Sequence, residues 1–224
     1  MRRGGNFLIG AGLAVLLYAG VILFWGDPVT WVWSHYKQRE LTAELNRAAE
    51  SFRITPLDHT DDAAALAYVR RSADTFERQV ELAHAFGRLQ IGRIGLSVVV
   101  VHGTDRWRDL VKGPGHYEDT DFPGQGRTVA IAGHRTTFGA WFRHIDSIQD
   151  GDYITLQMPY ATFKYRVEKH QISNNNDRAA LIGDVGYDRL MLSACHPLYS
   201  ASQRWIVFAR AVSVTLPDGY SVRL

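Results

Sequence analysis

The first strong pattern in the chain is an uncharged apolar run at residues 7–25. At about 1.5 Å rise per residue, its roughly 19 residues come close to the roughly 30 Å hydrocarbon core of a bilayer. Arg2 and Arg3 precede the run and Asp27 follows it, which places the N-terminus in the cytoplasm and the remainder outside. We therefore predict an uncleaved transmembrane signal-anchor. The alternative is a cleaved signal peptide, which would have a shorter apolar core and a small-residue cleavage site.

Two helical patterns follow this run. In residues 34–52, apolar positions recur at spacings near 3.6 among Lys, Arg and Glu, which predicts an amphipathic helix. Residues 60–62 supply a cap and early negative charge for a second helix, whose apolar positions continue to Ala83, with Gly87 as the stop. We expect this second helix to pack on its own domain, the alternative being a coiled-coil seam between two chains.

From Ile91 onward the pattern changes to short β-branched and aromatic runs separated by Gly, Pro, Asn and Asp. Such a pattern is typical of an antiparallel barrel or sandwich. The candidate strands are residues 92–101, 128–133, 152–158, 162–170, 189–194 and 204–215. The chain is accordingly divided into an N-terminus with its signal-anchor (1–33), N-terminal helices or a helical stalk (34–90) and a β-rich domain (91–224).

Composition narrows the possible functions. A hydrophobic content of 46% and a charged content of 21% allow one sizeable core, so we expect one globular domain. The formal charge is +2 and the Lys and Arg residues form no basic blocks, which argues against nucleic-acid binding. The single cysteine excludes an intramolecular disulfide, and a free thiol in an exported domain indicates intermolecular pairing or a reactive group.

That cysteine, Cys195, stands where an alternating apolar strand ends, because Pro197 prevents its simple continuation. A lone cysteine is often a small buried hydrophobe. His134, however, also follows an apolar strand, and Arg204 opens the strand after Cys195. Together they offer a nucleophile, a proton donor and acceptor, and a cation for an oxyanion. From spacing alone, a hydrogen-bonded surface histidine and a solvated arginine remain alternatives for these two residues.

A metal centre is not expected. His116, His134, His196 and Cys195 could converge on zinc, but none shows the close paired spacing of a zinc site. No acidic cluster indicates a calcium site. We therefore predict no metal and no cofactor.

Four stretches of the β-rich domain resemble the sortase family, and in detail its class E members from actinobacteria. They are residues 94–100, 112–117, 130–137 and 195–204. The order and spacing of His134, Cys195 and Arg204 match the catalytic trio of that family, so the resemblance implies these three as catalytic residues. It further implies substrate contacts by Tyr117, Ala194 and His196. The implied fold is mostly β, a closed barrel of about eight strands with short helices, preceded by a transmembrane helix and amphipathic helices.

The activity implied by the resemblance is that of a membrane-anchored cysteine transpeptidase with an extracellular catalytic domain. Its partners would be exported proteins with a C-terminal sorting signal of the Leu-Pro-x-Thr-Gly or Leu-Ala-x-Thr-Gly kind. Cleavage between Thr and Gly would give a thioacyl enzyme, resolved by a peptidoglycan precursor or another amine. One alternative is a membrane-anchored cysteine peptidase that hydrolyses the same bond. The other is a catalytically altered β-barrel binding module.

The sequence departs from the family pattern just before the cysteine. The family strand usually has the sequence Thr-Leu-x-Thr-Cys, whereas residues 191–195 are Met-Leu-Ser-Ala-Cys. Ala194 therefore lacks a hydroxyl in the region where the family binds substrate and oxyanion. The resemblance leaves the catalytic trio in place and predicts a difference in fine substrate preference.

Overall fold

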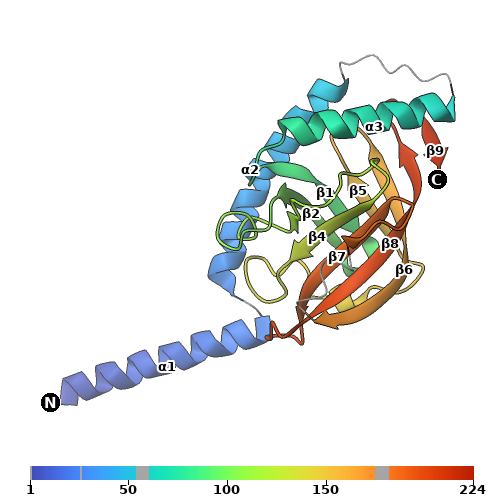
Figure 1. Cartoon of the computed structure of the whole chain (residues 1–224). Helices are drawn as coiled ribbons and strands as arrows, with labels where there is room; N and C mark the ends of the chain where they lie inside the picture. Colours follow the sequence, from blue (N-terminus) through green and yellow to red (C-terminus); the bar gives the residue numbers. More distant parts are fainter. Residues whose placement is uncertain (1, 26, 54–60, 175–181) are drawn as a thin grey trace.

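The structure, a computed structural model, describes residues 2–25, 27–53, 61–174 and 182–224. Three helices precede the sheet: α1 (Arg2–Trp25), α2 (Pro28–Arg53) and α3 (Asp62–Gln79). Figure 1 shows α1 extending away from the body of the molecule, while α2 and α3 lie against the barrel.

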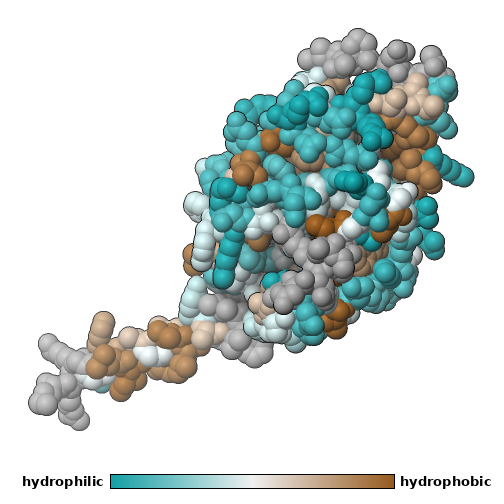
Figure 2. All heavy atoms as spheres, viewed as in Figure 1, coloured by the Kyte–Doolittle hydropathy of each residue, from teal (hydrophilic) through white to brown (hydrophobic). Residues whose placement is uncertain are grey.

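Helix α1 carries its apolar side chains in the open. Phe7, Leu8 and Leu17 expose 76%, 71% and 72% of their surface, and Figure 2 shows this helix as a mainly hydrophobic projection. Among the described residues, no helix combines the length and the apolar character needed to cross a membrane. The predicted spanning segment is therefore not confirmed.

Helix α3 packs on its own barrel. Its N-cap is Asp61, whose side chain accepts a hydrogen bond from the backbone N–H of Ala64 at 2.8 Å, as the sequence predicts. Val69, Ala73 and Phe76 on its apolar face belong to the same buried cluster as the barrel interior. Docking on the domain is thereby confirmed, and the coiled-coil alternative finds no support in this arrangement.

The predicted end of that helix is wrong. The helix stops at Gln79 because Val80 takes an extended backbone (φ −77°, ψ 126°), and Ala83 has a positive φ of 71°. A strand that the sequence pattern did not predict then begins at Ala85, so Gly87 lies inside a strand and does not stop a helix. The barrel accordingly starts before the domain boundary expected at Ile91.

The strands form one sheet that closes on itself. In the described ranges they run in the order β6-β5-β1-β2-β3-β4-β7-β8-β9, and an additional β6–β8 pairing closes eight of them into a ring with β9 at its margin. The predicted closed barrel of about eight strands is confirmed. The predicted strand 92–101 is instead the short helix η1 followed by β2. The bounds are β1 (Ala85–Ile91), η1 (Gly92–Ile94), β2 (Leu96–His102), β3 (Gly115–His116), β4 (Thr128–Gly133), η2 (Ile145–Ser147), β5 (Tyr153–Gln157), β6 (Thr162–Asn174), β7 (Arg189–His196), β8 (Gln203–Thr215) and β9 (Ser221–Arg223).

Helix α2 covers part of β2 with hydrogen bonds and apolar contacts. The side chain of Gln38 donates to the carbonyl of Val99 at 2.8 Å and to that of Lys112 at 3.1 Å, and it accepts from the N–H of Val99 at 2.7 Å. Leu41 and Leu45 of the same helix pack with Val99 in a second small buried cluster. The amide of Gln38 thus takes the place that a neighbouring strand would occupy beside Val99.

Docking of α3 is testable by comparing two positions on the helix. Phe76 is 4% exposed and Leu66 is 37% exposed. Because truncating a buried phenylalanine leaves a cavity, Phe76→Ala should lower the free energy of unfolding by about 3–5 kcal/mol. The matched Leu66→Ala should cost less than about 1 kcal/mol. Urea denaturation measures both, and similar costs at the two positions would contradict the docking of α3.

Candidate active site

The alternation of side chains along β4, β7 and β8 separates two faces of the barrel wall. Val129, Ile131, Leu190, Leu192, Val207 and Ala209 lie in the interior cluster. The alternate residues Ala130, Met191, Ile206 and Phe208 form a separate buried cluster on the opposite face. Since side chains alternate with a period of two, His134, Cys195 and Arg204 continue this second, outer set. The three predicted catalytic residues therefore project from the same face of the sheet.

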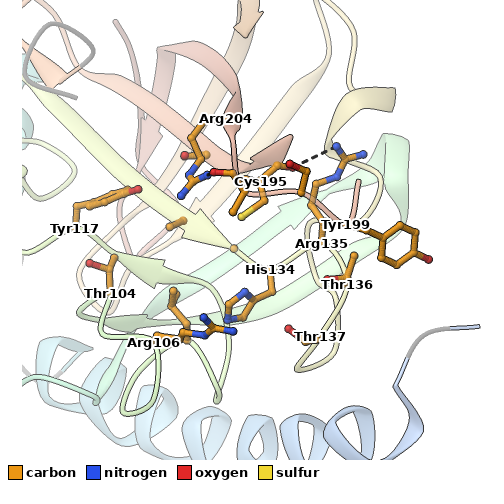
Figure 3. Close-up of a pocket in the computed structure, with 17 residues that line it drawn as sticks. Thr104, Arg106, Tyr117, His134, Arg135, Thr136, Thr137, Cys195, Tyr199 and Arg204 are labelled. Atoms are coloured by element: carbon orange, nitrogen blue, oxygen red, sulfur yellow. Dashed lines mark hydrogen bonds between the residues drawn. The ribbon is translucent and has the colours of Figure 1, made fainter. Parts of the chain in front are cut away.

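The pairing of the strands brings these three residues together. β4 and β7 are parallel, and their last register pair is Gly133 with Ala194. His134 and Cys195 are the next residues on strands that lie ~4.8 Å apart. β7 and β8 are antiparallel, and Cys195 is directly paired with Arg204. The thiol thus stands between the imidazole and the guanidinium (Figure 3).

The three residues line one cavity of about 530 Å³. Its lining includes the register pair Ala132 and Ser193, whose small side chains leave the wall hollow between the reactive groups. Tyr117 and Ala194, both predicted as substrate contacts, also line it. Ala194 is 2% exposed and belongs to the interior cluster, so a hydroxyl added there would have to be accommodated at the core.

His196 is placed differently from the other predicted substrate residues. It follows Cys195 on β7 and therefore points to the other face of the sheet. Its ring centroid lies 5.5 Å from that of Trp205, and it does not line the cavity. A substrate contact by His196 stays a prediction. His116 does not line the cavity either: it stacks on Phe86 with centroids 4.0 Å apart and is fully buried.

Burial controls the protonation of His134. Loss of solvent, and to a lesser extent the nearby positive charge of Arg106, together lower the pKa of this imidazole from 6.5 to about 4. Between these two pH values the unfolded chain binds a proton that the folded chain does not, so acidification through this window destabilises the fold. At neutral pH the imidazole is uncharged and able to accept a proton.

The Nε2 atom of His134 is buried and has no hydrogen-bond partner within the described ranges. Buried polar atoms are nearly always paired, so an unpaired one needs an explanation. A ring nitrogen that exchanges a proton with thiol and substrate supplies one, because its partner is present only during the reaction.

The backbone around His134 is held by close packing. A Cβ on Gly133 would lie 2.5 Å from the ring of Phe142, which is fully buried. The N–H of Phe142 donates to the carbonyl of His134 at 3.0 Å, and that of Phe138 donates to the hydroxyl of Thr30 on α2 at 2.9 Å. The loop that carries His134 is therefore fixed to the barrel and to α2.

Arg204 is anchored but keeps free donors. Its Nη1 donates to the carbonyls of Ala201 and Gln203 at 3.0 and 2.9 Å, which holds the side chain at the β7–β8 turn. Its Nε and Nη2 have no hydrogen-bond partner in the part of the chain that the structure describes. Guanidinium donors in a fixed orientation suit an oxyanion or a peptide carbonyl.

Sequence reasoning missed several residues of the cavity. Thr104 and Arg106 come from the loop after β2, Thr136 and Thr137 from the loop after His134, and Tyr199 from the β7–β8 turn. Figure 3 shows Arg106 next to His134. The Thr136-Thr137 pair lies within the stretch 130–137 that resembles the sortase family, but no periodicity or motif marks Arg106.

The geometry agrees with comparisons to known proteins. A model of the sortase domain matches residues 89–212, which is more than half of the chain. The chain belongs to the sortase family. This sortase is 29% identical to Sortase D of Bacillus subtilis (strain 168), over 92% of this chain and 96% of that protein. It is therefore an enzyme, a cysteine transpeptidase of the sortase type.

Two further relatives carry class E names. Sortase SrtE1 of Streptomyces coelicolor is 26% identical over 94% of this chain, which spans 57% of that protein's length. The solved structure of sortase E from Streptomyces avermitilis superposes with a TM-score of 0.55, at 29% identity, over 62% of this sortase and 94% of that chain. The similarities thus extend to both class D and class E.

Removing the charge of Arg106 should raise the pKa of His134. The titration midpoint of the His134 ring, followed by NMR, should move to higher pH in Arg106→Gln, because protonation no longer opposes a nearby cation. Arg106→Lys keeps the charge and should stay near the wild type, and added salt should shrink the difference between Gln and wild type. Equal midpoints for Arg106→Gln and wild type would refute this electrostatic effect.

Gly133→Ala tests the close packing beneath His134. The added methyl group must displace the ring of Phe142 or the end of β4, which should cost about 1–3 kcal/mol in the free energy of unfolding. The control is Gly92→Ala, since a Cβ on Gly92 would meet nothing within 4 Å. Thermal denaturation and the NMR titration of His134 report the change. A Gly133 variant with the stability of the Gly92 variant and an unaltered His134 titration would show that the contact is not tight.

Proposed function

We propose that this sortase cleaves a C-terminal sorting signal between Thr and Gly and joins the new carboxyl end to an amine of the cell wall. The observation that carries the proposal is the placement of His134, Cys195 and Arg204 on three adjacent strands around one cavity. The volume of the cavity, about 530 Å³, is large enough for several peptide residues.

In the first step, neutral His134 accepts the proton of Cys195 as the sulfur attacks the Thr carbonyl carbon. The free donors of Arg204 stabilise the oxyanion. Because burial lowers the pKa of His134 to about 4, the imidazole is neutral at pH 7 before the reaction begins. The same low pKa makes the imidazolium, once formed, a strong acid.

In the second step, that imidazolium gives its proton to the amine of the departing glycine, which breaks the peptide bond and leaves a thioacyl enzyme. His134 is then neutral again. It accepts a proton from an incoming amine as this attacks the thioacyl carbon, and Cys195 leaves as the thiol after receiving that proton. The product is an amide bond, and the enzyme returns to its starting state.

Substrate selection forms a further part of the proposal. Tyr117 lines the cavity and shapes the site for the second signal residue, Pro or Ala in the Leu-Pro-x-Thr-Gly and Leu-Ala-x-Thr-Gly signals. Ala194 and His196 are proposed as additional substrate contacts, with Ala194 supported by its place in the lining. Class E membership is supported by the SrtE relatives, although a Sortase D relative is similar over more of its own length.

We place the catalytic domain outside the cell, held at the membrane by the apolar segment 7–25. The exposed apolar side chains of α1 support this attachment, because such a surface is stabilised when it leaves water. The proposed partners are exported proteins with a sorting signal and a peptidoglycan precursor that supplies the amine.

The decisive experiment incubates the full chain in detergent micelles with a Leu-Ala-x-Thr-Gly peptide, with and without triglycine as acceptor. Mass spectrometry should detect a thioacyl adduct on the only cysteine and a ligated product that requires triglycine. Cys195→Ala should give neither. Arg204→Lys keeps the charge but loses the paired donors, and should lower kcat by about 10²–10³.

Three outcomes separate the hypotheses. Ligation that depends on Cys195 supports transpeptidation. Cleavage without ligation at saturating acceptor would mean that the chain hydrolyses this bond. Absence of any adduct with Leu-Pro and Leu-Ala peptides alike would reject the proposed substrate.

A further inference from the structure

The hydrogen-bonded ladder between β4 and β7 ends one residue too early to fix the reacting groups. It runs from the pair Thr128 and Arg189 to the pair Gly133 and Ala194. Cys195 is still paired on its other side with Arg204 of β8. Nothing in the ladder holds it to His134, so the separation of thiol and imidazole needs another restraint.

The side chain of Arg135 spans this gap. It is 4% exposed, and its Nη1 donates to the carbonyl of Cys195 at 3.4 Å, the contact drawn as a dashed line in Figure 3. Its Nε and Nη2 donate to the carbonyl of Arg143 at 3.2 and 3.1 Å, and Nη2 also pairs with the carboxylate of Asp146. One rigid guanidinium thus joins the loop that carries His134 to the backbone of the nucleophile.

Because Arg135 directly follows His134, its backbone and its side chain act on opposite sides of the gap. The Arg143 carbonyl and the Asp146 carboxylate hold the guanidinium in place on the side of the loop. Its hydrogen bond to the Cys195 carbonyl therefore fixes the distance between this loop and the backbone of Cys195. A planar fork with donors in fixed directions can serve these acceptors together, whereas the single ammonium of lysine cannot.

We propose that Arg135 is a positioning residue that sets the separation of His134 and Cys195 for proton transfer. This proposal rests on the proposed function, in which these two residues exchange a proton. Arg135 touches neither the substrate carbonyl nor the departing amine in that scheme. It acts through the backbone of Cys195.

A second buried arginine provides a matched control at the other end of the same two strands. Arg189 is 7% exposed, and it links β7 to β4 through a hydrogen bond from its Nε to the hydroxyl of Thr128 at 3.1 Å. It also donates to the carbonyl of Gly183 at 3.1 Å. Both arginines tie β4 to β7, but only Arg135 does so beside the reacting groups.

The test compares Arg135→Lys with Arg189→Lys in the full chain. Both variants should lower Tm, because each loses hydrogen bonds to buried acceptors. Only Arg135→Lys should lower kcat for peptide transfer, by about 10- to 100-fold with KM little changed, because misplacement of a reacting group affects the chemical step. Equal losses of kcat in the two variants, or wild-type kcat in Arg135→Lys, would overturn the proposal.

A measurement without substrate keeps this proposal separate from the proposed function. Iodoacetamide alkylates Cys195, the only cysteine in the chain. The rate of this reaction is measured in four proteins: the wild type, His134→Gln, Arg135→Lys and the double variant. We expect His134→Gln to slow alkylation several-fold in the Arg135 background and to have little effect in the Arg135→Lys background.

The outcomes of this cycle are distinct. The same His134 effect in both backgrounds would overturn the role of Arg135, whatever peptide the enzyme cleaves. If no peptide is transferred but the cycle shows coupling, the proposed substrate fails while the positioning role stands. If His134→Gln does not change the alkylation rate in the Arg135 background, both the proton exchange between His134 and Cys195 and the role of Arg135 are rejected.

Discussion

The parallel pairing of β4 with β7 is the constraint on which the rest of the site depends. Parallel neighbours end at the same edge of a sheet, so this one pairing brings the residues after Gly133 and Ala194 to a common level. Parallel strands also require a long crossover, and here β5 and β6 lie within it and complete the ring. The barrel wall and the alignment of imidazole and thiol therefore come from the same topological requirement.

The surroundings of His134 have to meet two opposing requirements, stability of the fold and availability of a ring nitrogen for the reaction. A buried imidazole whose Nε2 has no partner among the described residues is unfavourable for folding, yet it leaves that nitrogen available to the thiol. The packing of Phe142 on Gly133 and the hydrogen bond from Phe138 to Thr30 hold the loop in this unfavourable position. Stability contributed elsewhere in the barrel thus maintains a site that would not be stable by itself.

The reactive residues of the site were easier to predict from the sequence than the residues and strands that hold them in place. Their positions at strand ends made His134, Cys195 and Arg204 candidates, and the resemblance to the sortase family implied their catalytic roles. The structure shows that the three line one cavity, and the roles themselves stay predictions. The strand at Ala85 was missed because its apolar spacing continues the helical pattern of α3. Gly87 resembles a helix stop, but its role is close approach, since a Cβ there would lie 2.7 Å from the sulfur of Met158. Arg135 lies in the stretch 130–137 that resembles the family, but the sequence predicts no role for it, because its contact with Cys195 depends on a strand register that no local pattern encodes.

The amide of Gln38 has a consequence for how the protein can be shortened. It satisfies both backbone groups of Val99 on the side of β2 where none of the described strands lies beside that residue. A fragment that begins at β1 would leave those groups open, next to apolar side chains that Leu41 and Leu45 now cover. Open strand margins recruit other chains. Helix α2 therefore covers a strand margin that would otherwise be open to pairing with another chain, and we expect a shortened form of this enzyme to need α2.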